Sequence, residues 1–486
     1  MEPTPLGELL RDVPHRLAGV SASVTVTGIC TDTRRIKPGD LFFALKGENS
    51  DGHQYVRQAL DAGALAAIVS AQPVGDPPGP LIVVEDTVRT LGLAARNYRR
   101  RFPIPLVAIT GSVGKTSVRE MTAAVLRACY RTLSSSKNYN NEIGVPLTLF
   151  ELSGEHEAAV VEMGMRGLEE IDWLAQVAEP TIGLITNIGH SHLERLGSRD
   201  GIAQAKAELL ARLPAHGTAI LPRHDDYFDY LCSRVPAGCR IITFSDSPEH
   251  QPDVAVTVAE GRPTAVINGE TTDLFLEPFA PHAARNAAAA VAAGTAMRIP
   301  AHLMKDAFRS LQPVEGRLRT LPGKNWMCVV DDCYNAAPES MAAALAMLGT
   351  GQSVLSIGRS LPPDCLPLEY ARMRRVAILG DMRELGELGP QLHRTVGRQV
   401  IDARVNLLIT VGNLAMEIAA EAERYAGERG TPGPLHRHFP DSAAAAAGID
   451  FLLAPLDYVL VKGSRAMEME KIVAVLTGEA GTSPHG

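Results

Sequence analysis

The chain has 486 residues, of which 45% are hydrophobic and 21% are charged, so its composition is that of a globular protein and excludes wholesale disorder. At about 150 residues per domain, this length predicts roughly three domains. Lys and Arg total 47 against 55 Asp and Glu, a formal charge of -8, and the absence of long runs of like charge argues against nucleic-acid binding.

The sequence contains no pattern for export or membrane insertion. Residues 1–20 lack a basic start followed by an apolar core, so we expect no signal peptide. The longest apolar candidate, 283–297, is interrupted by Arg285 and Asn286 and falls short of the roughly 18 to 20 residues of a membrane span, which predicts a buried helix. The seven cysteines are odd in number and include no C-x-x-C pair, which disfavours a disulfide scaffold or a zinc site. We expect a soluble, cytoplasmic protein.

Short β-branched runs alternate with amphipathic stretches, which predicts α/β domains with largely parallel sheets. Buried strands are expected, in chain order, at 107–110, 159–161, 182–186, 329–331, 376–379, 407–410 and 458–461. We also expect antiparallel strands within 246–272 and a long loop at 353–375, which contains three prolines. Boundaries near 99–105 and 312–316 divide the chain into expected domains 1–102, 103–313 and 314–486.

A glycine-containing segment after the first of these strands indicates a phosphate-binding loop. Gly111 and Gly114 permit the positive φ angles that turn successive N–H groups toward a phosphate. Lys115 can reach terminal phosphates, and the hydroxyl of Thr116 suits Mg²⁺ at the start of the following helix. Ile109 stands where the standard P-loop has its first glycine, so kinases, NTPases and ligases all remain open on this segment alone.

Acidic and basic side chains follow the next strands. Glu162 ends a predicted strand, where ligands of open α/β sheets gather, and is placed to face the phosphates and Mg²⁺. His190 and His192 follow another strand, and each by itself is more often a hydrogen-bonded loop residue. Lys206 lies on a predicted helix; because a free ammonium would be repelled by Mg²⁺, a metal-binding role would require its chemical modification.

Seven segments carry recognisable residue patterns in order along nearly the whole chain. They are 31–34 with 39–44 and 51–53, then 110–116, 138–146, 187–197, 331–338, 379–386 and 461–465. Together they resemble the Mur ligase family, ATP-dependent amide-forming enzymes of peptidoglycan precursor synthesis. The resemblance is strongest to the member that adds D-alanyl-D-alanine to UDP-N-acetylmuramoyl-tripeptide.

The resemblance implies a three-domain α/β fold with a central P-loop ATPase domain of parallel strands and a Rossmann-like C-terminal domain that closes over the site. The first domain would bind the uridine diphosphate end of the substrate, through Thr33, Arg34, Asp51, Gly52 and His53. Whether Arg34 or the adjacent Arg35 contacts this ligand stays open.

The resemblance also implies the residues that bind ATP and metal. The nucleotide would contact Gly111, Ser112, Gly114, Lys115, Thr116, Asn286, Arg317, Asp332, Tyr334 and Asn335. Thr116 and Glu162 would bind one Mg²⁺, and His192 would bind a second with Lys206, which the family typically carries as a carbamate. The catalytic residues would be Lys115, His192, Lys206 and Arg317, while His190 matches no family role and is treated as part of the loop.

Two positions depart from the family pattern. Ala283 stands where the family usually has Asn, which removes a hydrogen bond to adenine with a net contribution of about 0.5 to 1.5 kcal/mol. Ser191 stands where other members often have Asp.

The family reaction would join the tripeptide carboxylate to the amine of D-alanyl-D-alanine through an acyl phosphate, in a monomer with small-molecule partners only. Three alternatives are weighed: the member that adds the third residue, a related ligase recruited to a specialised metabolite, and a non-catalytic nucleotide-binding module. The first usually carries Asp-Asn-Pro-Arg in its third domain, which this chain lacks. The two expected metal positions argue against a pure binding module.

Overall fold

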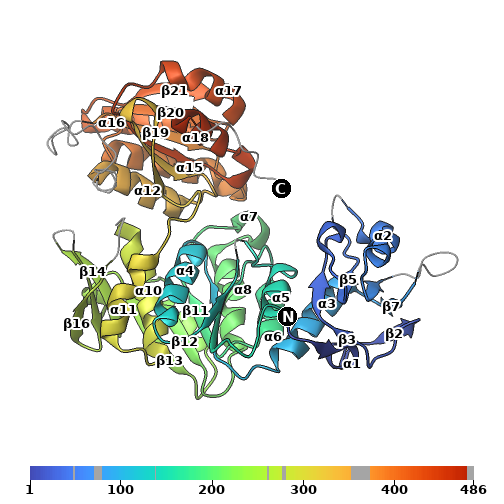
Figure 1. Ribbon diagram of the computed structural model, residues 1–486. Coiled ribbons are helices and arrows are strands. Elements are labelled where there is room, and N and C mark those ends of the chain that lie inside the picture. The colour runs from blue at the N-terminus through green and yellow to red at the C-terminus, as the bar shows by residue number, and fades with distance from the viewer. Residues whose placement is uncertain are drawn as a thin grey trace.

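The computed structural model describes residues 1–47, 50–70, 79–136, 138–259, 262–275, 281–351 and 373–478. Within these ranges, successive parts of the chain form a five-stranded, a nine-stranded and a six-stranded sheet, each with helices beside it (Figure 1). The expected boundaries at 102/103 and 313/314 fall between these sheets. None of the described helices is long and apolar enough to cross a membrane.

The first domain is a mostly parallel sheet in the order β2-β7-β6-β5-β4, with β2 antiparallel to β7. Its strands are β2 (His15–Ala18), β4 (Gly28–Cys30), β5 (Asp40–Phe43), β6 (Ala66–Val69) and β7 (Leu81–Val84), and a separate ribbon pairs β1 (Thr4–Pro5) with β3 (Thr25–Val26). Its helices are α1 (Leu6–Leu9), α2 (Val56–Asp61) and α3 (Thr87–Arg99).

Helix α3 joins the first domain to the central one. Its N-terminus is capped by the Asp86 carboxylate, which accepts from the backbone N–H of Arg89. On the same helix, the buried Tyr98 donates its hydroxyl to the Leu152 carbonyl of the central domain at 2.6 Å. The apolar core on this side runs without interruption from α1 and α3 into the central domain, so these two domains are firmly attached.

The central sheet has the strand order β16-β15-β14-β13-β12-β11-β8-β10-β9. Its members are β8 (Leu106–Thr110), β9 (Thr132–Ser134), β10 (Ala158–Glu162), β11 (Ile182–Ile185), β12 (Thr218–Pro222), β13 (Arg240–Ser245), β14 (Val254–Ala259), β15 (Arg262–Ile267) and β16 (Glu270–Asp273). All neighbouring strands from β9 across to β14 in this order pair in parallel. The pairs β14–β15 and β15–β16 are antiparallel, as expected within 246–272.

Helices cover both faces of this sheet. Along β8, Leu106 and Ala108 face one apolar core and Val107 and Ile109 the other, the alternation of a strand between two helix layers. The helices are α4 (Lys115–Arg127), α5 (Gly144–Leu149), α6 (Glu170–Ala178), α7 (Leu193–Leu196), α8 (Arg199–Ala211), α9 (Phe228–Ser233), α10 (Pro281–Ala296) and α11 (Ala301–Ala307). The predicted buried helix at 283–297 is confirmed as α10, whose alanines pack with α4 on one face.

The C-terminal sheet has the order β17-β18-β22-β19-β20-β21 and is parallel except where β17 pairs with β18. Its strands are β17 (Arg319–Pro322), β18 (Cys328–Asp332), β19 (Arg375–Gly380), β20 (Leu407–Val411), β21 (Leu435–Phe439) and β22 (Tyr458–Lys462). One face is covered by α12 (Pro338–Thr350), α15 (Gly389–Asp402) and α16 (Met416–Arg429), and the other by α17 (Ser442–Gly448) and α18 (Glu470–Thr477).

All seven predicted buried strands are present, each within one residue of its expected ends. The predicted loop at 353–375 lies outside the described residues apart from 373–375, where β19 begins. The C-terminal domain and the first domain contact different sides of the central one, and α12 lies against α10 (Figure 1). The carboxyl ends of β8, β10 and β11 therefore point toward the seam between the central and C-terminal domains.

Candidate active site

The phosphate loop, residues 110–116, follows β8 and leads into α4. Gly111 has φ 148° and Gly114 has φ 84°, angles that L side chains rarely adopt. A Cβ added to Gly111 would lie 1.8 Å from the Thr186 Oγ1, so the loop can take this path only with glycine there. The Lys115 Nζ donates to the Gly111 carbonyl at 2.8 Å and so lies over the loop, where burial lowers its pKa.

Thr116 and Glu162 meet beside this loop, as predicted. The Thr116 hydroxyl donates to the Glu162 Oε2 at 2.9 Å, and the Asn140 Nδ2 donates to the other carboxylate oxygen at 2.9 Å. The Thr116 hydroxyl and the Glu162 carboxylate suit Mg²⁺, which prefers oxygen ligands and is typically held by one or two carboxylates together with substrate phosphates. The buried guanidinium of Arg119 lies 3.9 Å from the same carboxylate, and its positive charge partly offsets the negative charge there.

His192 and Lys206 occupy different surroundings. The His192 Nδ1 lies 2.6 Å from the Glu384 Oε2 of the C-terminal domain, so a residue expected to bind metal here contacts a carboxylate. Lys206 on α8 is 1% exposed, and burial, followed by the charge of Lys115, lowers its pKa well below the ordinary value. Burial favours the neutral form of the amine, which is the form that reacts with CO₂; as an amine it would not suit Mg²⁺, but as a carbamate it would.

Within the described ranges, no three His, Cys, Asp or Glu side chains gather as a metal-binding group. The two expected Mg²⁺ positions would therefore need the Thr116 hydroxyl and a modified Lys206 besides Glu162 and His192. A small cavity of about 50 Å³ brings several predicted residues together at the phosphate loop; it is lined among others by Ser112, Gly114, Lys115, His192, Arg317 and Asn335.

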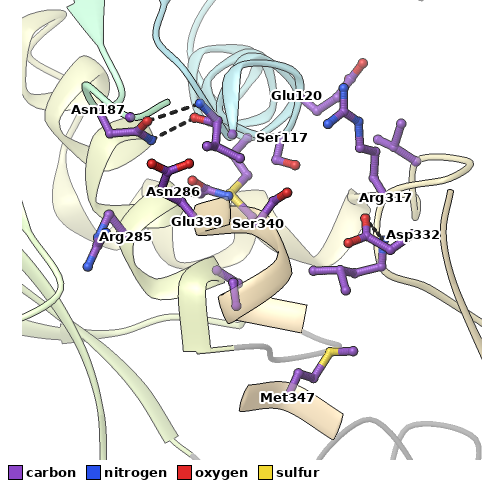
Figure 2. A pocket seen from close by; sticks show the side chains of 18 of the residues that line it. Ser117, Glu120, Asn187, Arg285, Asn286, Arg317, Asp332, Glu339, Ser340 and Met347 are labelled. Atoms are coloured by element: carbon purple, nitrogen blue, oxygen red, sulfur yellow. Dashed lines mark hydrogen bonds between the residues drawn. The ribbon is translucent and has the colours of Figure 1, made fainter. Parts of the chain in front are cut away.

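A larger cleft of about 450 Å³ adjoins this cavity between the central and C-terminal domains. Figure 2 shows Asn187, Asn286 and Arg317 around the same space, although they come from three separate parts of the chain. A Cβ on Gly114 would lie 2.8 Å from the Asn286 Oδ1, so this glycine lets the phosphate loop approach α10 closely. A cleft of this volume is in the range of small-molecule and cofactor sites.

The C-terminal domain contributes Arg317, Asp332, Tyr334 and Asn335 near this cleft. The Arg317 guanidinium lies over the Tyr334 ring, 4.1 Å from its centre, which holds both side chains by a cation–π contact. Asp332, expected at the ribose, accepts from the buried Lys462 Nζ at 2.6 Å. That ammonium also donates to the Asn335 carbonyl at 2.9 Å. Burial raises the pKa of Asp332, and the charge of Lys462 opposes this rise.

A second contact joins the two domains at the edge of the cleft. Glu339, in the first turn of α12, accepts at one carboxylate oxygen from the His190 backbone N–H at 3.0 Å and from its Nδ1–H at 2.5 Å. A Cβ on Gly189 would lie 2.6 Å from the same oxygen, so the glycine makes room for the carboxylate. His190 lies in the loop, as expected, but the structure also gives it a contact between domains.

The five residues expected to bind uridine diphosphate lie apart from this cleft, in the first domain. Gly52 admits no side chain, because a Cβ would lie 2.7 Å from both the N and O atoms of Leu45. The His53 Nε2 accepts from the backbone N–H of Ser70 at 2.9 Å, so its Nδ1–H donates to Asp51 at 2.6 Å. The hydrogen bonds from His53 hold the pKa of Asp51 below its ordinary value.

Thr33 and Arg34 lie in a short 3₁₀ turn, Thr33–Arg35, beside the strand edge. The Arg34 guanidinium donates to both carboxylate oxygens of Asp32, and its side chain is 81% exposed. Arg35 is exposed as well, so burial does not distinguish the two arginines as ligands.

Comparison with known proteins shows the family to which the chain belongs. Family models match in three places: the Mur ligase family catalytic domain at 25–99, the Mur ligase middle domain at 109–294 and the Mur ligase glutamate ligase domain at 367–465. The UDP-N-acetylmuramoyl-tripeptide–D-alanyl-D-alanine ligase of Synechocystis is 36% identical over 96% of this chain and 95% of its own length. The ligase of the same name from Escherichia coli is 34% identical over 94% of each chain. This chain belongs to the Mur ligase family.

Solved structures agree with this membership. A crystal structure of MurF from Acinetobacter baumannii superposes with a TM-score of 0.85 at 29% identity, covering 99% of this chain and 100% of that one. MurF from Thermotoga maritima, solved in complex with ADP, has a TM-score of 0.76 at 23% identity over 93% and 97% of the two chains, which shows the shared fold. The three-domain α/β ligase predicted from the seven segments is thereby confirmed.

Several residues of the site had no predicted role. Asn140 and Lys462 lie within the segments 138–146 and 461–465 that carry the family resemblance, so their positions could have been singled out. Glu339 and Glu384 could not have been paired with their histidines, because 149 residues separate Glu339 from His190 and no local pattern relates them.

Proposed function

We propose that this chain joins D-alanyl-D-alanine to UDP-N-acetylmuramoyl-tripeptide in the cytoplasm, at the cost of ATP, in peptidoglycan precursor synthesis. The observation that carries the proposal is the cleft with its adjoining cavity, where Lys115 and Asn286 of one domain lie opposite Arg317 and Asp332 of another. It occurs in a chain that aligns along nearly its whole length with two ligases of this name. All the expected groups belong to one chain, so a monomer would suffice.

The phosphate loop would hold the ATP phosphates. The N-terminus of α4 and the loop N–H groups offer positive potential, and Lys115 would leave the Gly111 carbonyl to reach the γ-phosphate. Arg317, which lines both the small cavity and the larger cleft, would approach the same phosphate from the C-terminal domain. Two cations from opposite sides would offset the repulsion between the anionic phosphate and the incoming carboxylate.

In the first step an oxygen of the tripeptide carboxylate attacks the γ-phosphorus, and the bond to the β-γ bridging oxygen breaks, giving an acyl phosphate and ADP. In the second step the amine of the dipeptide attacks the acyl carbon through a tetrahedral intermediate. Phosphate leaves with the electron pair of the C–O bond, and the amine loses a proton to a base. The contacts His190–Glu339 and His192–Glu384 would keep the domains together and water away from the acyl phosphate.

Metal binding forms part of the proposal. Thr116 and Glu162 would hold one Mg²⁺ and His192 and Lys206 a second, and these ions would neutralise phosphate charge. For this role the neutral Lys206 amine would add CO₂ and release a proton, forming a carbamate. Its burial and lowered pKa support this assignment.

The deciding experiment measures phosphate release with ATP, Mg²⁺ and UDP-N-acetylmuramoyl-tripeptide, with and without D-alanyl-D-alanine. Both tripeptides, ending in diaminopimelate or in lysine, are supplied in turn. We expect release that depends on the dipeptide and a product heavier by that dipeptide. The Lys115→Ala enzyme should release no phosphate while keeping the thermal stability of the wild type.

Release in the absence of the dipeptide, or no release with either tripeptide, would contradict the proposal. In that case a ligase recruited to other carboxylates and amines becomes the better hypothesis, and these substrates are screened with the same assay.

A further inference from the structure

The cleft continues beyond the phosphate loop along the start of α10. Asn286 lies next to Gly114, and Arg285 precedes it in the same helix (Figure 2). Apolar side chains line this part of the cleft: Ala283, Leu311, Pro313, Val314 and Met347. A nucleotide whose phosphates occupy the loop would extend its flat base into this apolar part.

The charged groups at this end are already paired. The Arg285 Nη2 donates to the Asp246 carboxylate at 2.8 Å. The carboxylate of Asp225 accepts from the backbone N–H of Ile188 at 2.8 Å. The Arg199 Nη1 donates to the Asp226 carboxylate at 3.0 Å. These contacts hold the walls of the cleft in place.

His224 differs from these neighbours. It lines the same cleft, yet both of its ring nitrogens are buried and neither has a hydrogen-bond partner. The ring contacts the rings of Phe244 and His250, at 6.4 Å and 6.1 Å between centres. A buried donor and a buried acceptor without partners cost free energy, so such a residue calls for an explanation, and a bound ligand is one.

The protonation state of His224 is set by its surroundings. Burial, and after it the charge of Arg285, lowers the pKa of His224 to about 4, although Asp246 opposes this change. At neutral pH the ring therefore carries one N–H donor and one acceptor nitrogen. The edge of adenine likewise offers an amino donor beside a ring-nitrogen acceptor. Rotation about the Cβ–Cγ bond of a histidine is soft, so the ring can turn its nitrogens toward the cleft.

We propose that His224 binds the purine base of the nucleotide, and that the base supplies the hydrogen-bond partner which its imidazole lacks. This assignment rests on the proposed use of ATP and names a further residue for it. Ala283, which lines the same cleft, offers only a methyl group, so a polar contact to the base must come from another side chain, and His224 can supply it.

The test compares ligands with and without a base. Dissociation constants of ADP and of inorganic tripolyphosphate are measured by calorimetry for the wild type, His224→Phe and His224→Gln. Phe keeps the ring contacts but has no polar atom, whereas Gln keeps a donor and an acceptor. His250→Phe is the matched control, because it makes the same change in the neighbouring ring, which is exposed and does not line the cleft.

We expect His224→Phe to raise the dissociation constant of ADP about 3- to 10-fold, which corresponds to the loss of one hydrogen bond. The dissociation constant of tripolyphosphate should stay unchanged. His224→Gln should recover part of the loss, and His250→Phe should bind both ligands as the wild type does. Unchanged ADP binding in His224→Phe, or equal weakening of both ligands, would overturn the assignment, since the latter indicates a structural histidine. Wild-type enzyme that binds tripolyphosphate but not ADP would also overturn the assignment, because the base contact would then be absent. Failure of dipeptide-dependent turnover would count against the proposed function and leave the assignment of His224 to the base unaffected.

Discussion

The substitution Gly189→Ala tests whether the contact of Glu339 with His190 holds the domains together during the reaction. The added Cβ would lie 2.6 Å from the Glu339 Oε1 and 2.7 Å from its Cδ. Because unstrained carbon contacts begin near 3.5 Å, the carboxylate would have to move by roughly 0.8 Å. Such a shift breaks the hydrogen bonds from the His190 N–H and Nδ1–H, now 3.0 Å and 2.5 Å long.

The free-energy cost of this substitution follows from the loss of these two hydrogen bonds. A hydrogen bond to a charged group contributes about 1.5 to 3 kcal/mol when it is well protected. The side chains of His190 and Glu339 are 27% and 36% exposed, so we reduce the combined loss to about 1 to 2 kcal/mol. A loss of this size lowers the population of the closed arrangement about 5- to 30-fold. We expect kcat/KM to fall by that factor, and phosphate release without amide formation to rise, in an assay that follows both products.

A double-mutant cycle separates this effect from a general disturbance. In the Glu339→Ala background the added methyl meets no carboxylate, so Gly189→Ala should cost nothing more there. Gly427→Ala, which adds a methyl to α16 where no atom lies within 4 Å, should leave kcat/KM unchanged. A Gly189→Ala enzyme with wild-type kcat/KM, or one equally impaired in both backgrounds, would refute this reasoning.

Three further predictions address other parts of the chain. Lys206→Arg keeps a long basic side chain but cannot form a carbamate, so we expect loss of turnover, together with loss of the carbamate carbon signal that ¹³C-bicarbonate gives in the wild-type NMR spectrum. His53→Ala removes a ring held between Asp51 and Ser70, and should raise KM for the uridine-linked substrate without changing KM for ATP in steady-state kinetics. His393 is buried with Nε2 accepting from the Met382 N–H, and burial lowers its pKa below the ordinary 6.5. As the pH falls, His393 is therefore protonated in the unfolded chain before it is protonated in the folded protein. The contribution of neutral His393 to stability is present above about pH 6.5 and is lost below it. Tm should fall less steeply with acidification in His393→Gln.

The elements and motifs that depend on neighbouring residues were predictable from the sequence. The seven buried strands, helix α10 and the phosphate loop were found where expected, because side-chain periodicity and glycine-dependent turns are local properties. The pairing of Thr116 with Glu162 could also be anticipated, since the carboxyl ends of parallel strands meet at one edge of the sheet.

The contacts between distant parts of the chain could not be anticipated in this way. Lys462 lies 130 positions from Asp332, and only the parallel pairing of β22 with β18 brings the two side chains together. His190 and Glu339 meet only because two domains pack against each other at the cleft.

The sequence by itself thus determined the α/β class, the family and many of the residues that line the cleft and the adjoining cavity. The tertiary structure decided what each of those residues contacts: Asp332 with Lys462, and His192 with Glu384. It also placed His224 in the cleft without a hydrogen-bond partner for its ring. The physical reason is that burial, pKa and hydrogen bonding depend on all the groups nearby in space, and folding brings most of those groups from distant parts of the chain.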